Sequence, residues 1–227
     1  MKINEAIEDY LKTIYEIQSE CGRVATTVLA RRMSIAPASA TGMIKRLAEL
    51  NLVSYQPYQG IELTSHGSKI ALEVLRHHRL IELYLVEALG MSWDKVHHEA
   101  ERLEHVMSKE LIERIDLYLG HPAFDPHGQP IPDSEGNIAK VSAVRLADLK
   151  TGQSAVVSEV IDRDPKMLRY LAELGIFPKA SVHVLDIAPF EGPIRILIGD
   201  DEKSIGFELA KSIFVKNVVV ENEGVTD

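Results

Sequence analysis

The stretch Trp93–Ser108, WDKVHHEAERLEHVMS, decides how the rest of the chain is interpreted. A helix turns by about 100° per residue, so a helix over this stretch places two imidazoles and two carboxylates on one stripe of its surface. Such a stripe can converge on a single cation. The spacing therefore predicts a helix that carries metal ligands. The four side chains belong to His97, Glu101, Glu104 and His105.

A second pair of the same kind lies upstream, in an otherwise apolar helical pattern. His78 and Glu82 have the i, i+4 spacing that places two side chains on one helix face. Nitrogen and oxygen donors without a thiolate suit manganese, iron, cobalt or zinc better than copper(I) or an iron–sulfur cluster. The alternative is a solvated face of i, i+4 pairs, but a stripe of four donors with a matching pair elsewhere favours metal binding.

The composition indicates a protein with apolar cores and no membrane span. The 227 residues are 45% hydrophobic, enough for one large domain or two to three small ones. There is no run of about 18 or more apolar residues, and the amphipathic N-terminal pattern does not fit a secretory signal. We therefore expect a cytoplasmic protein without a membrane partner. The single cysteine, Cys21, cannot form an internal disulfide.

The N-terminal quarter of the chain has the pattern of a winged helix-turn-helix. Asn4 can cap a first helix, and Thr26 or Thr27 can cap a second, short helix. Pro37 suits the first turn of a third helix, because its missing N–H is not needed there. Alternating apolar residues on both sides of a turn at 56–60 predict a two-stranded wing.

The third helix of this pattern carries small polar and basic residues that suit a DNA major groove. Between Gly22 and Gly60 there are five basic residues and one acidic residue, in a chain whose net charge is −9. Such a basic segment is typical of a module that faces phosphates, although a solvated helical hairpin also carries some Lys and Arg. The candidate contacts to double-stranded operator DNA are Thr27, Pro37, Ser39, Thr41, Lys45 and Arg46.

The central part of the chain predicts a helical dimerisation domain. A long helix from residue 65 to about residue 89 has more apolar residues than one neighbouring helix can cover, which favours a homodimer. A further helix covers 109–119, and a segment rich in Pro and Gly follows at 120–140. In that segment we interpret Asp125 as a turn residue and His127 as an exposed side chain, with metal ligation as the alternative.

Beyond Val141 the pattern changes to short strands. About eighty residues of such strands with a single helix, Pro165–Leu174, predict a small barrel of the SH3 type. The predicted fold class is mainly α with a small β domain. Its parts are a winged helix-turn-helix at 1–64, a helical metal-binding and dimerisation domain with a linker at 65–140, and an SH3-like domain at 141–227. The predicted strands are Ala155–Ile161, Ser181–Ile187, Ile194–Ile198, Ser204–Phe207 and Lys216–Val220.

Four strings carry a family resemblance: EDYLKTIYEI (8–17), RHHRLIELYL (76–85), VHHEAERLEHVMS (96–108) and PHGQPIP (126–132). With the order of elements, they make the chain similar to the diphtheria toxin repressor family of metal-dependent transcription regulators, over almost its whole length. The resemblance implies a divalent metal bound between a DNA-binding and a dimerisation domain, and a metal-loaded dimer that represses genes for metal uptake. It also implies that the C-terminal barrel is similar to ferrous iron transport protein A.

The resemblance assigns metal ligands to two sites. It implies that the barrel completes the second site, where Asp164 is preferred over Asp162. The implied primary ligands are Asp9, Glu101, Glu104 and His105, and the implied second-site ligands are His78, Glu82 and His97.

Two of these residues indicate the metal. The iron-responsive branch of the family has Met at the position of Asp9 and Cys at the position of Glu101, whereas the manganese-responsive branch has carboxylates. Carboxylates favour the harder ion, so the resemblance implies Mn²⁺, with Fe²⁺, Co²⁺ or Zn²⁺ as substitutes. Some short manganese regulators have a further carboxylate where this chain has Lys12. A charged lysine cannot be a ligand, so a closely spaced two-ion cluster is not expected.

Three other interpretations stay open. The first is an iron-dependent repressor of the same family. The second is a metalloenzyme, in which clustered His and Glu residues leave a coordination position open for a substrate. The third is a metal-independent winged-helix regulator with a structural ion. The sequence has no nucleophile triad, Walker loop or dinucleotide-binding glycine pattern, which favours a protein that is not an enzyme.

Overall fold

The computed structural model describes residues 4–56, 59–161 and 164–220. The chain forms two compact units, and the division between them falls inside one continuous helix, after His78. The domain boundaries predicted at residues 64 and 140 were placed by sequence motifs and not by compactness, so they stay a prediction. The first unit contains the residues up to His78, Leu103–Lys109 and Pro132–Ile138; the second contains Arg79–Arg102, Glu110–Ile131 and the residues from Ala139 onward.

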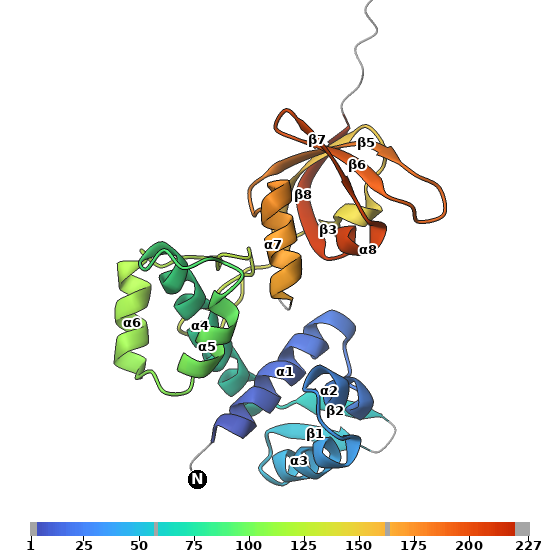
Figure 1. Cartoon of the computed structure of the whole chain (residues 1–227). Helices are drawn as coiled ribbons and strands as arrows, with labels where there is room; N and C mark the ends of the chain where they lie inside the picture. Colours follow the sequence, from blue (N-terminus) through green and yellow to red (C-terminus); the bar gives the residue numbers. More distant parts are fainter. Residues whose placement is uncertain (1–3, 57–58, 162–163, 221–227) are drawn as a thin grey trace, which may run out of the picture. The chain divides into compact units, whose positions relative to one another are not determined.

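The first unit begins with the winged helix-turn-helix, drawn in blue to cyan in Figure 1. Asn4 caps the first helix as predicted, because its side-chain oxygen accepts the Ile7 backbone N–H at 3.2 Å. Neither threonine caps the second helix, since Ala25 holds the N-cap position and Thr26 is already helical. Pro37 starts the third helix as predicted. The elements are α1 (Glu5–Cys21), α2 (Thr26–Arg32), α3 (Pro37–Glu49), β1 (Val53–Gln56) and β2 (Gly60–Leu63).

One apolar core holds these elements together. The wing is antiparallel, with Val53 opposite Leu63, and Ile61 also pairs with Val24. Removing apolar surface from water, at roughly 25 cal/mol per Å², is the main stabilising contribution here. The largest fully buried side chains are Ile7, Leu11, Ile14, Ile17, Leu29, Ile44, Leu47 and Ile61.

The helix expected over Trp93–Ser108 is shorter than predicted. α5 covers only Val96–Leu103, with a turn before it and a turn after it. The indole of Trp93 packs in the apolar core of the second unit instead of starting the helix. Glu104 and His105 lie in the turn after the helix. The prediction that they share a helical stripe with the two earlier donors is therefore wrong.

Two further helices agree with the sequence. α4 (Ser65–Glu87) and α6 (Lys109–Tyr118) lie close to the predicted ranges 65–89 and 109–119. Across the described residues, no helix is both long enough and apolar enough to cross a bilayer.

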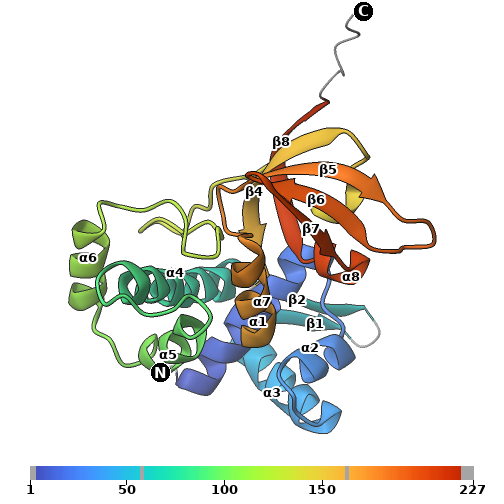
Figure 2. The same ribbon diagram turned by 45° about the horizontal axis from the view of Figure 1, so that its top comes forward.

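The second unit ends in a six-stranded antiparallel sheet with the order β3-β8-β4-β5-β6-β7. Figure 2 shows β5, β6 and β7 side by side at one end of this order. The small β domain is thus confirmed. The strands are β3 (Val144–Arg145), β4 (Gln153–Val160), β5 (Ser181–Ile187), β6 (Ile194–Ile198), β7 (Asp201–Ile205) and β8 (Ile213–Val220).

Three helical segments accompany this sheet. α7 (Pro165–Leu174) ends at Gly175, whose left-handed conformation (φ 78°) is typical of a helix C-terminus. The strand expected at Ser204–Phe207 ends earlier, because Phe207 already begins the short helix α8 (Phe207–Ala210). The 3₁₀ turn η1 covers Leu146–Asp148.

Candidate metal centres

Helix α1 and the turn after α5 bring three potential ligands together in the first unit. The candidate ligand atoms of Asp9, Glu104 and His105 lie within 4.8 Å of one another. The Nε2 atom of His105 lies 2.8 Å from Asp9 Oδ1 and 3.3 Å from Glu104 Oε1. The other ring nitrogen, Nδ1, lies 2.6 Å from Glu8 Oε2. We call Asp9, Glu104 and His105 the first centre.

Glu104 is the buried residue of the first centre. Its side chain is fully shielded from solvent. Lys12 Nζ lies 2.5 Å from Glu104 Oε1, and His78 Nδ1 lies 2.5 Å from Glu104 Oε2. A carboxylate is buried at an acceptable free-energy cost only when cations or hydrogen-bond donors compensate it. The partners of the buried Glu104 carboxylate therefore provide the positive charge and hydrogen bonds that compensate it.

The pKa values of the first centre reflect these contacts. Burial alone raises the pKa of Glu104, but hydrogen bonds from His105 and His78, with the charge of Lys12, outweigh it and hold that pKa well below its usual range. The hydrogen bond to Glu104 raises the pKa of His105 to about 9, against the effect of burial. Burial raises the pKa of Asp9. The lowered pKa of Glu104 means that this carboxylate stays ionised, so the first centre attracts cations even when no metal is bound.

The fourth predicted primary ligand, Glu101, has different partners. Its side chain is half-exposed on α5, with Oε1 3.6 Å from His97 Nε2 and Oε2 3.9 Å from His98 Nδ1. Glu101 is helical whereas Glu104 follows the end of the helix, so the two carboxylates do not repeat at helical spacing. Its role as a ligand stays a prediction.

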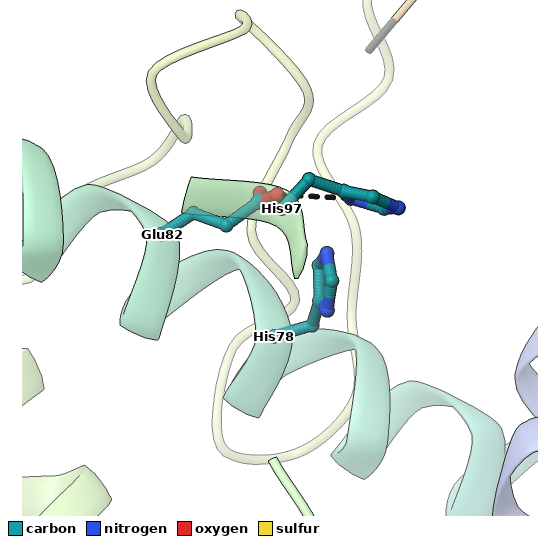
Figure 3. Close-up of side chains that lie close together, drawn as sticks. All are labelled: His78, Glu82 and His97. Atoms are coloured by element: carbon teal, nitrogen blue, oxygen red, sulfur yellow. Dashed lines mark hydrogen bonds and ion pairs between the residues drawn. The ribbon is translucent and has the colours of Figure 1, made fainter. Parts of the chain in front are cut away.

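Glu82 is a fully buried residue at the middle of a second set of donors. Its Oε1 atom lies 3.1 Å from His97 Nδ1, as the dashed line in Figure 3 marks. His78 is one turn earlier on the continuous helix α4, and Figure 3 shows its ring beside this pair. The candidate ligand atoms of His78, Glu82 and His97 lie within 4.8 Å of one another. The sequence-predicted donors of the second site are therefore close together.

Two further donors lie beside Glu82, and from the sequence metal ligation was only the alternative interpretation for them. The candidate ligand atoms of Asp125, His127 and Glu82 lie within 4.8 Å of one another, and all three residues are buried. His127 Nδ1 lies 3.8 Å from Glu82 Oε2, and Nε2 lies 2.8 Å from the carbonyl oxygen of Trp93. The expectation of an exposed His127 is therefore wrong. We call Glu82, His97, Asp125 and His127 the second centre.

A tight turn explains why these two donors point inward. Asp125 Oδ1 accepts the backbone N–H groups of His127 and Gln129 at 2.8 and 2.9 Å. Gly128 has a φ of +88°, and a Cβ there would lie 2.0 Å from the carbonyl oxygen of Ser158. Only glycine fits so close to another backbone. The Asp-Pro-His-Gly string is the sequence signal that could have identified this buried loop.

Asp164, which the resemblance assigned to the second site, caps α7. Its Oδ1 accepts the Lys166 backbone N–H at 2.8 Å, and the residue is exposed. Its assignment as a ligand stays a prediction, and Asp162 lies outside the described residues.

The predicted DNA contacts lie on α2 and α3. Lys45 and Arg46 are exposed, and within the described ranges neither has an ion-pair partner, whereas Arg23 pairs with Glu62 at 2.5 Å. The half-buried Thr41 donates its hydroxyl to the backbone of its own helix at 2.8 Å. Unpaired cations on a helix surface are available to phosphates. The other exposed candidates are Thr27, Pro37 and Ser39.

The donor chemistry fits a divalent ion of hard to borderline character. Both centres offer carboxylate oxygens and imidazole nitrogens, and no thiolate belongs to the donor groups in the described part of the chain. The Lys12 ammonium against Glu104 is a stand-in cation in the first centre. A winged helix-turn-helix combined with such centres defines a metal-responsive DNA-binding protein.

Family models agree with this class. Residues 2–61 match the iron dependent repressor N-terminal DNA binding domain, residues 64–133 its metal binding and dimerisation domain, and residues 144–217 the FeoA domain. The chain belongs to the iron-dependent repressor family of metal-dependent transcriptional repressors. The predicted resemblance is confirmed, and the metalloenzyme interpretation has no support because the family consists of DNA-binding regulators.

Relatives and solved structures cover nearly the whole chain. The iron-dependent repressor IdeR of Mycobacterium leprae is 30% identical over 226 residues, which are 94% of this chain and 98% of that protein. The diphtheria toxin repressor of Corynebacterium efficiens is 31% identical over 196 residues, 80% of this chain and 84% of that protein. A manganese-dependent transcriptional repressor in complex with manganese is 38% identical, with a TM-score of 0.87 over 92% of this chain and 98% of that chain.

Proposed function

We propose that this protein is a manganese-dependent transcriptional repressor that binds operator DNA as a metal-loaded homodimer and controls genes of metal uptake. As a regulator of DNA, it acts in the cytoplasm. The observation that carries the proposal is the carboxylate of Asp9, whose Oδ1 lies 2.8 Å from His105 Nε2 beside the buried Glu104.

The choice of Mn²⁺ rests on donor chemistry. Asp9 supplies an oxygen where the iron-responsive branch of the family has the sulfur of Met, and a harder donor favours a harder ion. The manganese-bound structural relative supports this choice. The mycobacterial relatives are iron-dependent repressors, which favours the alternative, an iron-dependent repressor. Fe²⁺, Co²⁺ and Zn²⁺ are candidate substitutes in either case.

In the first centre, we assign ligands to the three residues that already lie together. Asp9, Glu104 and His105 would hold the ion, with Glu101 as the predicted fourth ligand. A bound divalent ion would supply the positive charge that these acceptors share. Asp9 belongs to α1 of the DNA-binding part, whereas Glu104 and His105 belong to the stretch between α5 and α6. Shared ligation therefore restrains the DNA-binding helices, which is how we expect binding of the ion to favour a DNA-competent dimer.

The second centre supplies a further set of ligands. Glu82 and His97 were predicted from the sequence, and the structure supports adding Asp125 and His127, because both are buried against Glu82. A buried carboxylate between two imidazoles is typical of a site that takes a cation. We propose that this centre, with His78 as the third ligand predicted from the sequence, also binds a divalent ion.

Glu104→Ala tests the proposal. The variant should lose metal-dependent binding to promoter DNA, because the buried ligand is gone, and should remain a folded dimer. Electrophoretic mobility shift with and without MnCl₂, together with light scattering, measures both properties. Mutation of the outer partners that orient metal ligands typically costs about 10–100-fold in metal affinity, so loss of a ligand itself should cost at least as much.

The matched control is Glu99→Ala on α5, because Glu99 is partly exposed and forms an ion pair with Arg102. This control should keep the wild-type response to Mn²⁺. Full manganese-responsive DNA binding by Glu104→Ala would contradict the assignment of the first centre. Binding of the wild type that survives chelation of all metal would contradict the sensor function itself.

A further inference from the structure

The first centre contains an internal cation, the ammonium group of Lys12. The side chain of Lys12 is only 10% exposed, and its Nζ lies 2.5 Å from Glu104 Oε1. Asp9 precedes Lys12 by three residues on α1, so the helix directs both side chains to one face. An ammonium group in such a buried place is costly unless a partner compensates it. The ion pair with the carboxylate of Glu104 therefore stabilises Lys12 in this buried place.

Lys12 contacts the same oxygen that a metal ion in the first centre needs. Glu104 Oε1 lies 2.5 Å from Lys12 Nζ and 3.3 Å from His105 Nε2, while Oε2 lies 2.5 Å from His78 Nδ1. An ammonium group has three donors and no lone pair, so it cannot become a metal ligand while charged. Lys12 and a divalent cation therefore exclude each other at Glu104 Oε1.

Electrostatics makes this competition strong. Two cations a few ångströms apart repel each other most where little water screens them, and Glu104 is fully shielded from solvent. Lys12 can move away, because its side chain is a flexible four-carbon stem with a strongly hydrated head. Breaking the Lys12–Glu104 ion pair therefore opposes metal binding without preventing it.

We propose that Lys12 is a tethered competitor of the metal, which fills the first centre in the metal-free protein and raises the metal concentration at which the repressor responds. This inference rests on the proposed function, because it takes the first centre as the regulatory metal site. It assigns to a residue that is not a ligand the role of setting metal affinity. A carboxylate or neutral side chain at this position removes the competition.

Lys12→Met tests the inference, because methionine keeps an unbranched apolar stem and removes the ammonium group. Calorimetric titration of the full-length metal-free protein with MnCl₂ should give a dissociation constant about tenfold or more below that of the wild type. Lys12→Arg keeps the positive charge and should stay within about threefold of the wild type. The matched control is Lys109→Met, which removes an exposed ammonium 3.4 Å from Glu73 and should leave Mn²⁺ binding unchanged.

Thermal melting separates competition from damage to the fold. Without metal, Lys12→Met should melt at a lower temperature than the wild type, because Glu104 has lost one partner. With Mn²⁺ its melting temperature should rise by more than that of the wild type, since tighter binding stabilises the folded state more.

The wild type and the variants report on different proposals. If the wild type binds Mn²⁺ and Lys12→Met binds it equally or more weakly, the inference is wrong. Equally tight binding by Lys12→Arg and Lys12→Met would also overturn it, because the charge would then not matter. A wild type that binds no divalent ion would overturn the proposed function and this inference with it.

Discussion

At the scale of single residues, the first centre depends on Glu104, a carboxylate with no exposure to solvent, with the Lys12 ammonium on one oxygen and a ring nitrogen of His78 on the other. The partners of Glu104 come from three parts of the chain: Lys12 on α1, His78 on α4 and the neighbouring His105. A buried carboxylate in such surroundings stays ionised, as its lowered pKa indicates. Metal affinity is therefore controlled both by the ligands and by the groups that occupy their oxygens.

Asp9→Met should shift the metal response from manganese towards iron. The thioether sulfur is a softer donor than a carboxylate, so the affinity for Mn²⁺ should fall relative to Fe²⁺ by about tenfold. Anaerobic titration with each ion, with DNA binding as the readout, measures the ratio. Glu5→Met, in the first turn of the same helix, is the control and should leave the ratio unchanged. An unchanged metal profile in Asp9→Met would remove the argument for manganese.

At the scale of elements, the start of α4 packs directly on the chain that follows α3. A Cβ on Gly67 would lie 2.0 Å from the carbonyl oxygen of Leu52, which also accepts the Thr64 backbone N–H at 3.0 Å. Only glycine permits this approach of helix to backbone. The junction between the wing and the helix that carries His78 and Glu82 is therefore closely packed.

Gly67→Ala should lower the free energy of unfolding by about 1–3 kcal/mol or more, because the added methyl group overlaps backbone that cannot move freely. Gly42→Ala makes the same change in α3, where nothing lies within 4 Å of the added Cβ. This control should gain about 0.5–1 kcal/mol, since alanine is the better helix former. Urea unfolding of the metal-free variants measures both changes. Equal stability of the two variants would show that the close approach of Gly67 to Leu52 is not maintained.

Helix α3 presents the basic side chains that we expect to contact phosphates. Lys45→Gln should weaken binding to all DNA sequences alike, because a phosphate contact carries no sequence information. The slope of log K against log salt concentration should fall in magnitude by about one unit. Binding titrations over a range of KCl concentrations test this expectation. Lys150→Gln, an exposed lysine in the C-terminal part, should leave the slope as it is in the wild type. A loss confined to one operator sequence would instead indicate a base contact.

At the scale of the whole molecule, the match to a dimerisation domain directs attention to the surface that a second copy of the chain would cover. α6 buries Ile112 and Ile115, whereas Leu111, Leu117 and Tyr118 on the same helix are exposed. This helix belongs to the segment that matches a dimerisation domain. An exposed apolar face on such a segment is typical of a subunit interface.

Leu117→Glu should weaken the dimer by about tenfold or more, since a charge would be buried against the partner subunit. Light scattering over a range of protein concentrations measures the change, and circular dichroism verifies that the chain is folded. Glu113→Gln on the same helix is the control and should stay dimeric. A Leu117→Glu variant that dimerises as tightly as the wild type would show that α6 does not form the interface.

Elements with local end signals were predicted well from the sequence. Asn4 caps α1 and Pro37 opens α3, because each acts through backbone geometry within a few residues. The helical periodicity of the sequence predicted a helix that continues past residue 103. It could not show that the chain leaves the helix after Leu103. The helical stripe was therefore wrong, although three of its four donors do lie in clusters.

The amino-acid sequence alone determined the kinds of donor, the order of the elements and the family, because residue types, spacing and end signals are local properties. Only the tertiary structure decided which donors meet. Asp9 and His105 are far apart in the chain, and only packing brings them to 2.8 Å. Packing also buries Asp125 and His127 beside Glu82 and places the Lys12 ammonium on Glu104. Burial and long-range contact have no local signature. The sequence can therefore indicate the turn at Asp125–Gly128, but its burial beside Glu82 and the internal cation appear only in the folded molecule.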